Sequence, residues 1–117
     1  MQILSIIKQH LIANFGDVIQ DVILFGSRVN GTANENSDYD IPIVLNCGYD
    51  WRYAAKISAA MYEIDVKYNI FTDNHLISVD ELKNSLRGSE PIFQRAIQKG
   101  LYAASSWHLA LDFDLLY

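Results

Sequence analysis

The stretch LFGSRVNGTANENSDYD, Leu24–Asp40, decides how this chain folds and where its chemistry lies. It starts with the apolar end of a strand, breaks at Gly26, and places Asp38 and Asp40 one residue apart before the apolar run Ile41–Leu45. Side chains alternate along a strand, so the two aspartates share one face. Because neighbouring like charges repel, this pair indicates that something positive lies between them.

The composition predicts one acidic, globular domain. The chain has 117 residues, 50% of them hydrophobic, and a formal net charge of −5, so one domain with a real core is expected. We expect that domain to cover residues 1–103, and residues 104–117 to form an apolar, aromatic interface tail. A duplex-binding protein normally carries a basic face, so nucleic acid is not expected as the main partner.

Membrane insertion and secretion are not expected either. The apolar runs fall short of the roughly 20 residues that span a bilayer, and the first residues lack the basic segment and cleavage site of a signal peptide. The single cysteine, Cys47, cannot form an internal disulfide, which fits a reducing compartment. A cytoplasmic location is therefore expected.

Hydrophobic periodicity predicts an α/β (α+β) fold, a small mixed β-sheet with helices packed on it. The expected helices cover residues 2–14, 51–68, 78–86 and 89–100, and the expected strands cover residues 22–25, 39–46 and 69–78. Ser78 and Glu81 have the spacing of a capping box at the start of the third helix. Pro42 lies inside the second strand and, because it has no N–H, predicts an unpaired point there.

The two expected strands that flank the opening stretch bring a phosphate-binding turn close to a metal site. Gly26 allows close backbone approach after the first strand, and free N–H groups with the Ser27 hydroxyl can hold phosphate oxygens. Gly31 permits the chain to turn back towards the carboxylates. Asp38 and Asp40 suit one or two hard divalent cations such as Mg²⁺, which often bridge to substrate phosphates. This combination favours phosphoryl or nucleotidyl transfer.

Seven residues of the stretch stand at fixed spacing: Gly26-Ser27-Arg28-x2-Gly31-x5-Ser37-Asp38-x-Asp40. This motif resembles that of the minimal nucleotidyltransferases, small single-domain members of the superfamily related to DNA polymerase β. The later stretch Ser89–Tyr102 also resembles the closing helix of that family. The resemblance implies the nucleotidyltransferase fold.

The resemblance also implies roles for individual residues. Asp38 and Asp40 would bind the catalytic Mg²⁺ ions. The triphosphate of ATP would be held by four residues, Gly26, Ser27, Arg28 and Ser37. The family usually adds a third carboxylate from a later strand, and Asp73 is the candidate because it lies inside the third expected strand. Asp65, near the end of a helix, is the alternative.

Two residues have open interpretations. Arg28 either neutralises phosphate or pairs with a nearby acid. His75 shares a strand face with Asp73 and either lines the pocket or is a hydrogen-bonded structural residue, the commoner case.

The activity implied by the resemblance is transfer of a nucleoside monophosphate, AMP from ATP, onto a hydroxyl, with pyrophosphate leaving. Members of the family encoded beside a helical partner called HEPN can act as antitoxins by adenylylating a toxin tyrosine, which implies a protein partner. Three alternatives stay open: an inactive module that acts as an antitoxin by occlusion, transfer onto a small cationic molecule, and assembly as a homo-oligomer.

Overall fold

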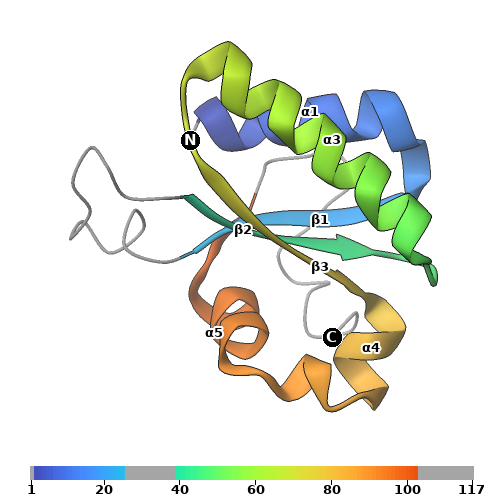
Figure 1. Ribbon diagram of the computed structural model, residues 1–117. Coiled ribbons are helices and arrows are strands. Elements are labelled where there is room, and N and C mark those ends of the chain that lie inside the picture. Colours follow the sequence, from blue (N-terminus) through green and yellow to red (C-terminus); the bar gives the residue numbers. More distant parts are fainter. Residues whose placement is uncertain (1, 26–38, 103–117) are drawn as a thin grey trace.

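The computed structural model describes residues 2–25 and 39–102 (Figure 1). Some predicted features lie outside these residues: Gly26, Ser27, Arg28, Ser37, Asp38 and the tail 104–117. The domain boundary at residue 103 and the interface role of the tail therefore stay predictions. None of the helices in the described ranges is long and apolar enough to cross a membrane.

Four strands form one mixed sheet in the order β3-β2-β1-β4. The strands are β1 (Ile19–Leu24), β2 (Tyr39–Leu45), β3 (Thr72–Ser78) and β4 (Leu101–Tyr102). β1 pairs antiparallel with both β2 and β4, whereas β2 and β3 are parallel. A parallel pair needs a crossover connection, and α3 (Trp51–Tyr68) supplies it. The predicted mixed sheet is confirmed.

Helices cover both faces of the sheet (Figure 1). α1 (Gln2–Phe15) and α3 pack on one face, and α4 (Val79–Asn84) and α5 (Pro91–Lys99) pack on the other. The α1/α3 layer is lined by Val22, Leu24, Ile43, Leu45 and Leu76, and the α4/α5 layer by Ile23, Val44 and Ile77. Because both faces of the sheet are buried, the strand sequences are nearly continuous apolar runs.

Most predicted elements are present, with shifted ends. β1 begins at Ile19 rather than Val22, and β3 begins at Thr72 rather than Asn69. The two-residue strand β4 was not predicted, because so short a segment carries no periodicity. The capping box is confirmed: the Ser78 hydroxyl accepts from the Glu81 N–H, and the Glu81 carboxylate accepts from the Ser78 N–H, both at 3.1 Å.

Pro42 lies in a strand that has a neighbour on each side. The β1–β2 ladder runs to the pair Val22↔Ile43 and resumes only at the isolated bridge Phe25↔Asp40. Pro42 falls in this interruption, which fits its missing N–H. The parallel ladder with β3 continues past it without a break.

Gly88 supports a first prediction. It lies in the 3-10 turn η2 (Arg87–Ser89), and a Cβ there would lie 2.4 Å from the carbonyl oxygens of both Glu81 and Leu82. Since these are backbone atoms, Gly88→Ala should lower the free energy of unfolding by about 1–3 kcal/mol in urea denaturation. Gly48→Ala is the matched control, because no atom lies within 4 Å of its added Cβ. Equal effects of the two substitutions would contradict this packing.

Candidate active site

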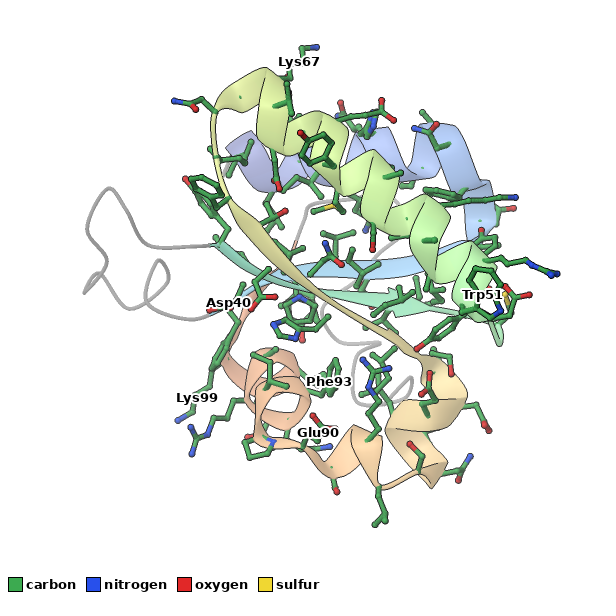
Figure 2. The ribbon with its side chains drawn as sticks, in the orientation of Figure 1. Asp40, Trp51, Lys67, Glu90, Phe93 and Lys99 are labelled. Atoms are coloured by element: carbon green, nitrogen blue, oxygen red, sulfur yellow. The ribbon has the colours of Figure 1, made fainter. Side chains whose placement is uncertain are left out.

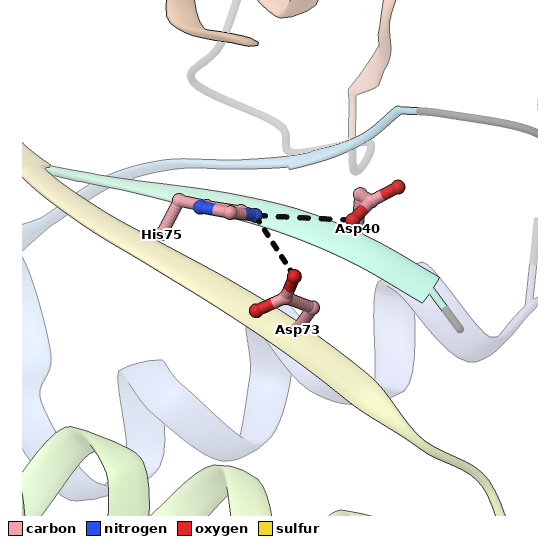
Figure 3. Close-up of side chains that lie close together, drawn as sticks. All are labelled: Asp40, Asp73 and His75. Atoms are coloured by element: carbon pink, nitrogen blue, oxygen red, sulfur yellow. Dashed lines mark ion pairs between the residues drawn. The ribbon is translucent and has the colours of Figure 1, made fainter.

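Asp40, Asp73 and His75 converge where β2 and β3 run side by side (Figure 3). In the parallel ladder, Asp40 pairs with Asp73 and Pro42 pairs with His75. Residues two apart share a face, so all three side chains lie on one side of the sheet. One ligand atom from each lies within 4.8 Å of the other two. The His75 Nε2 is 3.8 Å from Asp40 Oδ1 and 3.5 Å from Asp73 Oδ2.

These three residues lie on the sheet face that α5 covers, near the N-terminal ends of β2 and β3, where the face becomes exposed to solvent. Asp40 continues the β2 row that includes Val44, and Asp73 and His75 continue the β3 row that includes Ile77. The Asp73 side chain is 57% exposed, whereas those of Asp40 and His75 are 31% and 28% exposed. The site is therefore open on the Asp73 side.

Phe25, the residue that precedes the predicted phosphate-binding turn, lies beside Asp40. The Phe25 N–H donates to the Asp40 carbonyl at 2.9 Å, and Gly26 follows Phe25 directly in the sequence. On the other end of the same segment, the Tyr39 N–H donates to the Phe71 carbonyl at 2.8 Å. Phe25 and Tyr39, the described residues on either side of positions 26–38, are thus held by backbone hydrogen bonds near the carboxylates.

Asp65, the alternative third carboxylate, lies on the opposite side of the sheet. Its Oδ1 accepts a hydrogen bond from the Thr72 hydroxyl at 2.7 Å. Thr72 is one residue from Asp73, so the two side chains point to opposite faces. Asp65 therefore supports the turn between α3 and β3, and the fold brings Asp73 rather than Asp65 to Asp40.

The imidazole of His75 is held in place by α5. Its ring meets the Phe93 ring edge-on, with centroids 6.4 Å apart and an interplanar angle of 89°. Phe93 is 1% exposed and points from α5 into the space between this helix and the sheet (Figure 2). The Arg87 guanidinium lies over the same phenyl ring, 5.3 Å from its centroid.

Arg87 and Tyr49 form a bracing network that sequence reasoning missed. The Arg87 Nη1 donates to the Tyr49 hydroxyl at 2.8 Å and lies 3.6 Å from Glu81 Oε2. Burial raises the pKa of Tyr49, so its hydroxyl stays protonated and donates to the Leu76 carbonyl at 3.1 Å. No local pattern indicates these contacts, since Arg87 and Tyr49 are 38 residues apart.

The donors of this site fit a divalent cation. Two carboxylates and one imidazole are ligand types that proteins use for such ions. The His75 Nε2 is also buried and has no hydrogen-bond partner among the described residues. An orphaned nitrogen aimed at two carboxylates is what a ligand-binding position presents.

The family of the chain is established by a sequence match. The family model described as polymerase beta, nucleotidyltransferase, matches residues 5–98. This range contains the three strands β1 to β3 and all three residues of the site, so the chain belongs to the polymerase β nucleotidyltransferase family. The family and fold predicted from the opening motif are confirmed.

Three solved structures that are similar to this chain are described as toxin–antitoxin complexes. A crystal structure described as a toxin–antitoxin with AMP-PNP has a TM-score of 0.61 and 21% identity, covering 99% of this chain and 81% of that chain. An MntA–HpeT complex with two aspartate-to-glutamate substitutions has a TM-score of 0.60 and 20% identity, covering 94% and 77%. An MntA–HepT complex has a TM-score of 0.56 and 16% identity, covering 99% and 80%. These similarities establish the fold alone, and no curated protein sequence matches the chain.

Proposed function

We propose that this chain is a metal-dependent nucleotidyltransferase that moves AMP from ATP onto a hydroxyl of a partner protein. The observation that carries the proposal is the convergence of Asp40 and Asp73 on one sheet face, next to Phe25, the residue that precedes Gly26 in the sequence. Family membership supports the reaction class.

In this proposal each residue has a defined task. Asp38, Asp40 and Asp73 hold Mg²⁺, which supplies charge neutralisation and positions the reacting oxygen and phosphorus. The triphosphate is held by Gly26, Ser27, Arg28 and Ser37. Asp73 is the most exposed of the described site carboxylates, so it can reach an incoming hydroxyl and accept its proton.

The bonds change in one in-line displacement. The acceptor oxygen forms a bond to the α-phosphorus of ATP while the bond from that phosphorus to the bridging oxygen breaks. Pyrophosphate leaves with the bonding electron pair. Since little covalent chemistry falls to the protein, catalysis is mostly positioning and charge stabilisation.

The similar solved structures favour a protein as the acceptor of AMP. The similar solved structures are toxin–antitoxin complexes, one of them with AMP-PNP. We therefore propose a helical partner of HEPN type as the acceptor, and an antitoxin role for this chain.

One observation favours a second candidate function. His75 Nε2 lies 3.8 Å from Asp40 Oδ1 and 3.5 Å from Asp73 Oδ2, so the His75 ring takes up part of the space in which a cation would lie between the two carboxylates. A site partly filled in this way suits a module that neutralises its partner by occlusion, without catalysis.

Labelled ATP separates the two candidates. The purified chain is incubated with host lysate, Mg²⁺ or Mn²⁺, and ATP labelled at either the α- or the γ-phosphate. AMP transfer predicts a protein band labelled from the α-phosphate only. Label from the γ-phosphate would identify a kinase and overturn the proposal. The absence of any labelled protein, together with a stable complex with the partner, would instead support occlusion.

A further inference from the structure

His75 occupies a position that its surroundings do not explain. Its Nε2 is buried, lacks a hydrogen-bond partner among the described residues, and faces both carboxylates at 3.5 and 3.8 Å. Leaving a buried polar atom unpaired costs about 1–3 kcal/mol. The other Nε2 in this condition, that of His10, faces only one carboxylate, Glu63, at 3.6 Å. Of these two histidines, His75 is the one whose Nε2 lies near two carboxylates, either of which can also bind a metal ion.

The ring is also fixed before anything binds. Phe93 packs edge-on against it, Arg87 lies over Phe93, and Tyr49 holds Arg87 by a hydrogen bond. These contacts restrict the orientation of the His75 ring and keep its Nε2 directed at the two carboxylates.

The separations suit a single ion. Two donors about 2.1 Å from one ion lie about 3.0 Å apart in an octahedral site and about 3.4 Å apart in a tetrahedral one. The observed 3.5 and 3.8 Å exceed the tetrahedral value by about 0.1 and 0.4 Å, and the three donor atoms all lie within 4.8 Å of one another. Small rotations of the Asp40 and Asp73 carboxylates can close the difference.

We propose that His75 is a metal ligand through Nε2, together with Asp40 and Asp73, and that it shifts the site from Mg²⁺ towards transition cations such as Mn²⁺, Co²⁺ and Zn²⁺. Imidazole nitrogen suits these ions, whereas Mg²⁺ takes oxygen ligands. This inference rests on the metal site of the proposed function but does not depend on the acceptor or on turnover.

Metal titrations test the inference without any reaction. Isothermal titration calorimetry with Co²⁺ and with Mg²⁺ is carried out on tag-free protein in a Cys47→Ser background, since Cys47 is exposed and a thiolate also binds Co²⁺. We expect tighter binding of Co²⁺ than of Mg²⁺. His75→Gln should weaken Co²⁺ binding by at least about tenfold and change Mg²⁺ binding by about twofold or less.

Two further variants make the result specific. His75→Glu replaces the nitrogen donor by a carboxylate, which gives the site three oxygen-donating side chains, and should lower the ratio of Co²⁺ to Mg²⁺ affinity below that of the unsubstituted chain. His10→Gln, the matched histidine control, should change neither affinity. Circular dichroism melting establishes that each variant is folded, and a variant that is not folded is replaced by His75→Asn.

A spectroscopic measurement identifies the donor atom directly. Pulsed electron paramagnetic resonance of bound Mn²⁺ should show coupling to an imidazole nitrogen, and the coupling should vanish in His75→Gln. Unchanged Co²⁺ affinity in this variant, or Mn²⁺ bound without nitrogen coupling, would overturn the inference. AMP transfer that persists alongside that result would leave the proposed function standing.

Discussion

Asp40→Asn should lower the rate of AMP transfer by about 10²–10³-fold and leave the fold intact. The amide has the shape of the carboxylate but not its charge, so it removes a cation ligand that acts on the developing negative charge. The Asp40 side chain is partly exposed, and its backbone pairings to Phe25 and β3 do not involve the substituted atoms. The measurement is the initial rate of label transfer from α-labelled ATP, with thermal melting to check the fold.

The two candidates for the third carboxylate provide the matched pair for this experiment. Asp73→Asn should lower the rate to a similar extent as Asp40→Asn. Asp65→Asn should keep the rate within about twofold and cost about 1 kcal/mol of stability, because its carboxylate accepts a hydrogen bond from the Thr72 hydroxyl on the far face. Loss of activity in Asp65→Asn with full activity in Asp73→Asn would show that the site is assigned to the wrong face.

Phe93→Ala should destabilise the fold by about 3–5 kcal/mol, the range for removing a buried aromatic side chain. Phe93 is 1% exposed and fills the α4/α5 layer against Ile23, Val44 and Ile77. Its loss also removes the edge contact to His75. Urea denaturation followed by circular dichroism measures the free energy of unfolding. Since a small domain is stable by only about 5–15 kcal/mol, the experiment is best carried out at low temperature.

Another phenylalanine in the chain controls for this change. Phe71 is 72% exposed, so Phe71→Ala should alter the free energy of unfolding by about 0.5 kcal/mol or less. Phe93→Leu leaves a smaller cavity and should be folded. Its loss of free energy of unfolding should lie between those of Phe71→Ala and Phe93→Ala. A cost below about 1 kcal/mol for Phe93→Ala would contradict the packing of α5 against the sheet.

The long elements of the fold could be predicted because local signals agree with their burial. The helix at residues 51–68 was predicted to its ends: Asp50 caps its start, and Asn69, at a φ of 53°, ends it in the left-handed conformation. Asn is one of the few residues that adopt this conformation readily. The periodicity that predicted this helix agrees with the cap and the stop that the structure shows.

The early start of β1 could not be predicted, because a charged residue interrupts its pattern. Asp21 lies in the strand at 1% exposure, and Lys8 of α1 is 3% exposed. Burial lowers the pKa of Lys8, and the charge of Asp21 opposes that change. Only the folded structure places these two charges near each other, so the sequence alone offers no reason to extend a buried strand through Asp21.

The site was predictable in its residue types but not in its arrangement. Asp40 and Asp73 were selected by motif and by strand placement, yet their proximity depends on the parallel register of β2 and β3. A shift of one residue would turn Asp73 to the other face. The same register places the His75 imidazole against the two carboxylates.

Crystals of the chain grown with Mn²⁺ and AMP-PNP, with data collected at the manganese absorption edge, test the central claim most directly. The claim predicts an anomalous peak about 2.0–2.6 Å from carboxylate oxygens of both Asp40 and Asp73, next to the nucleotide phosphates. Nucleotide bound elsewhere, or a peak that avoids both carboxylates, would contradict it.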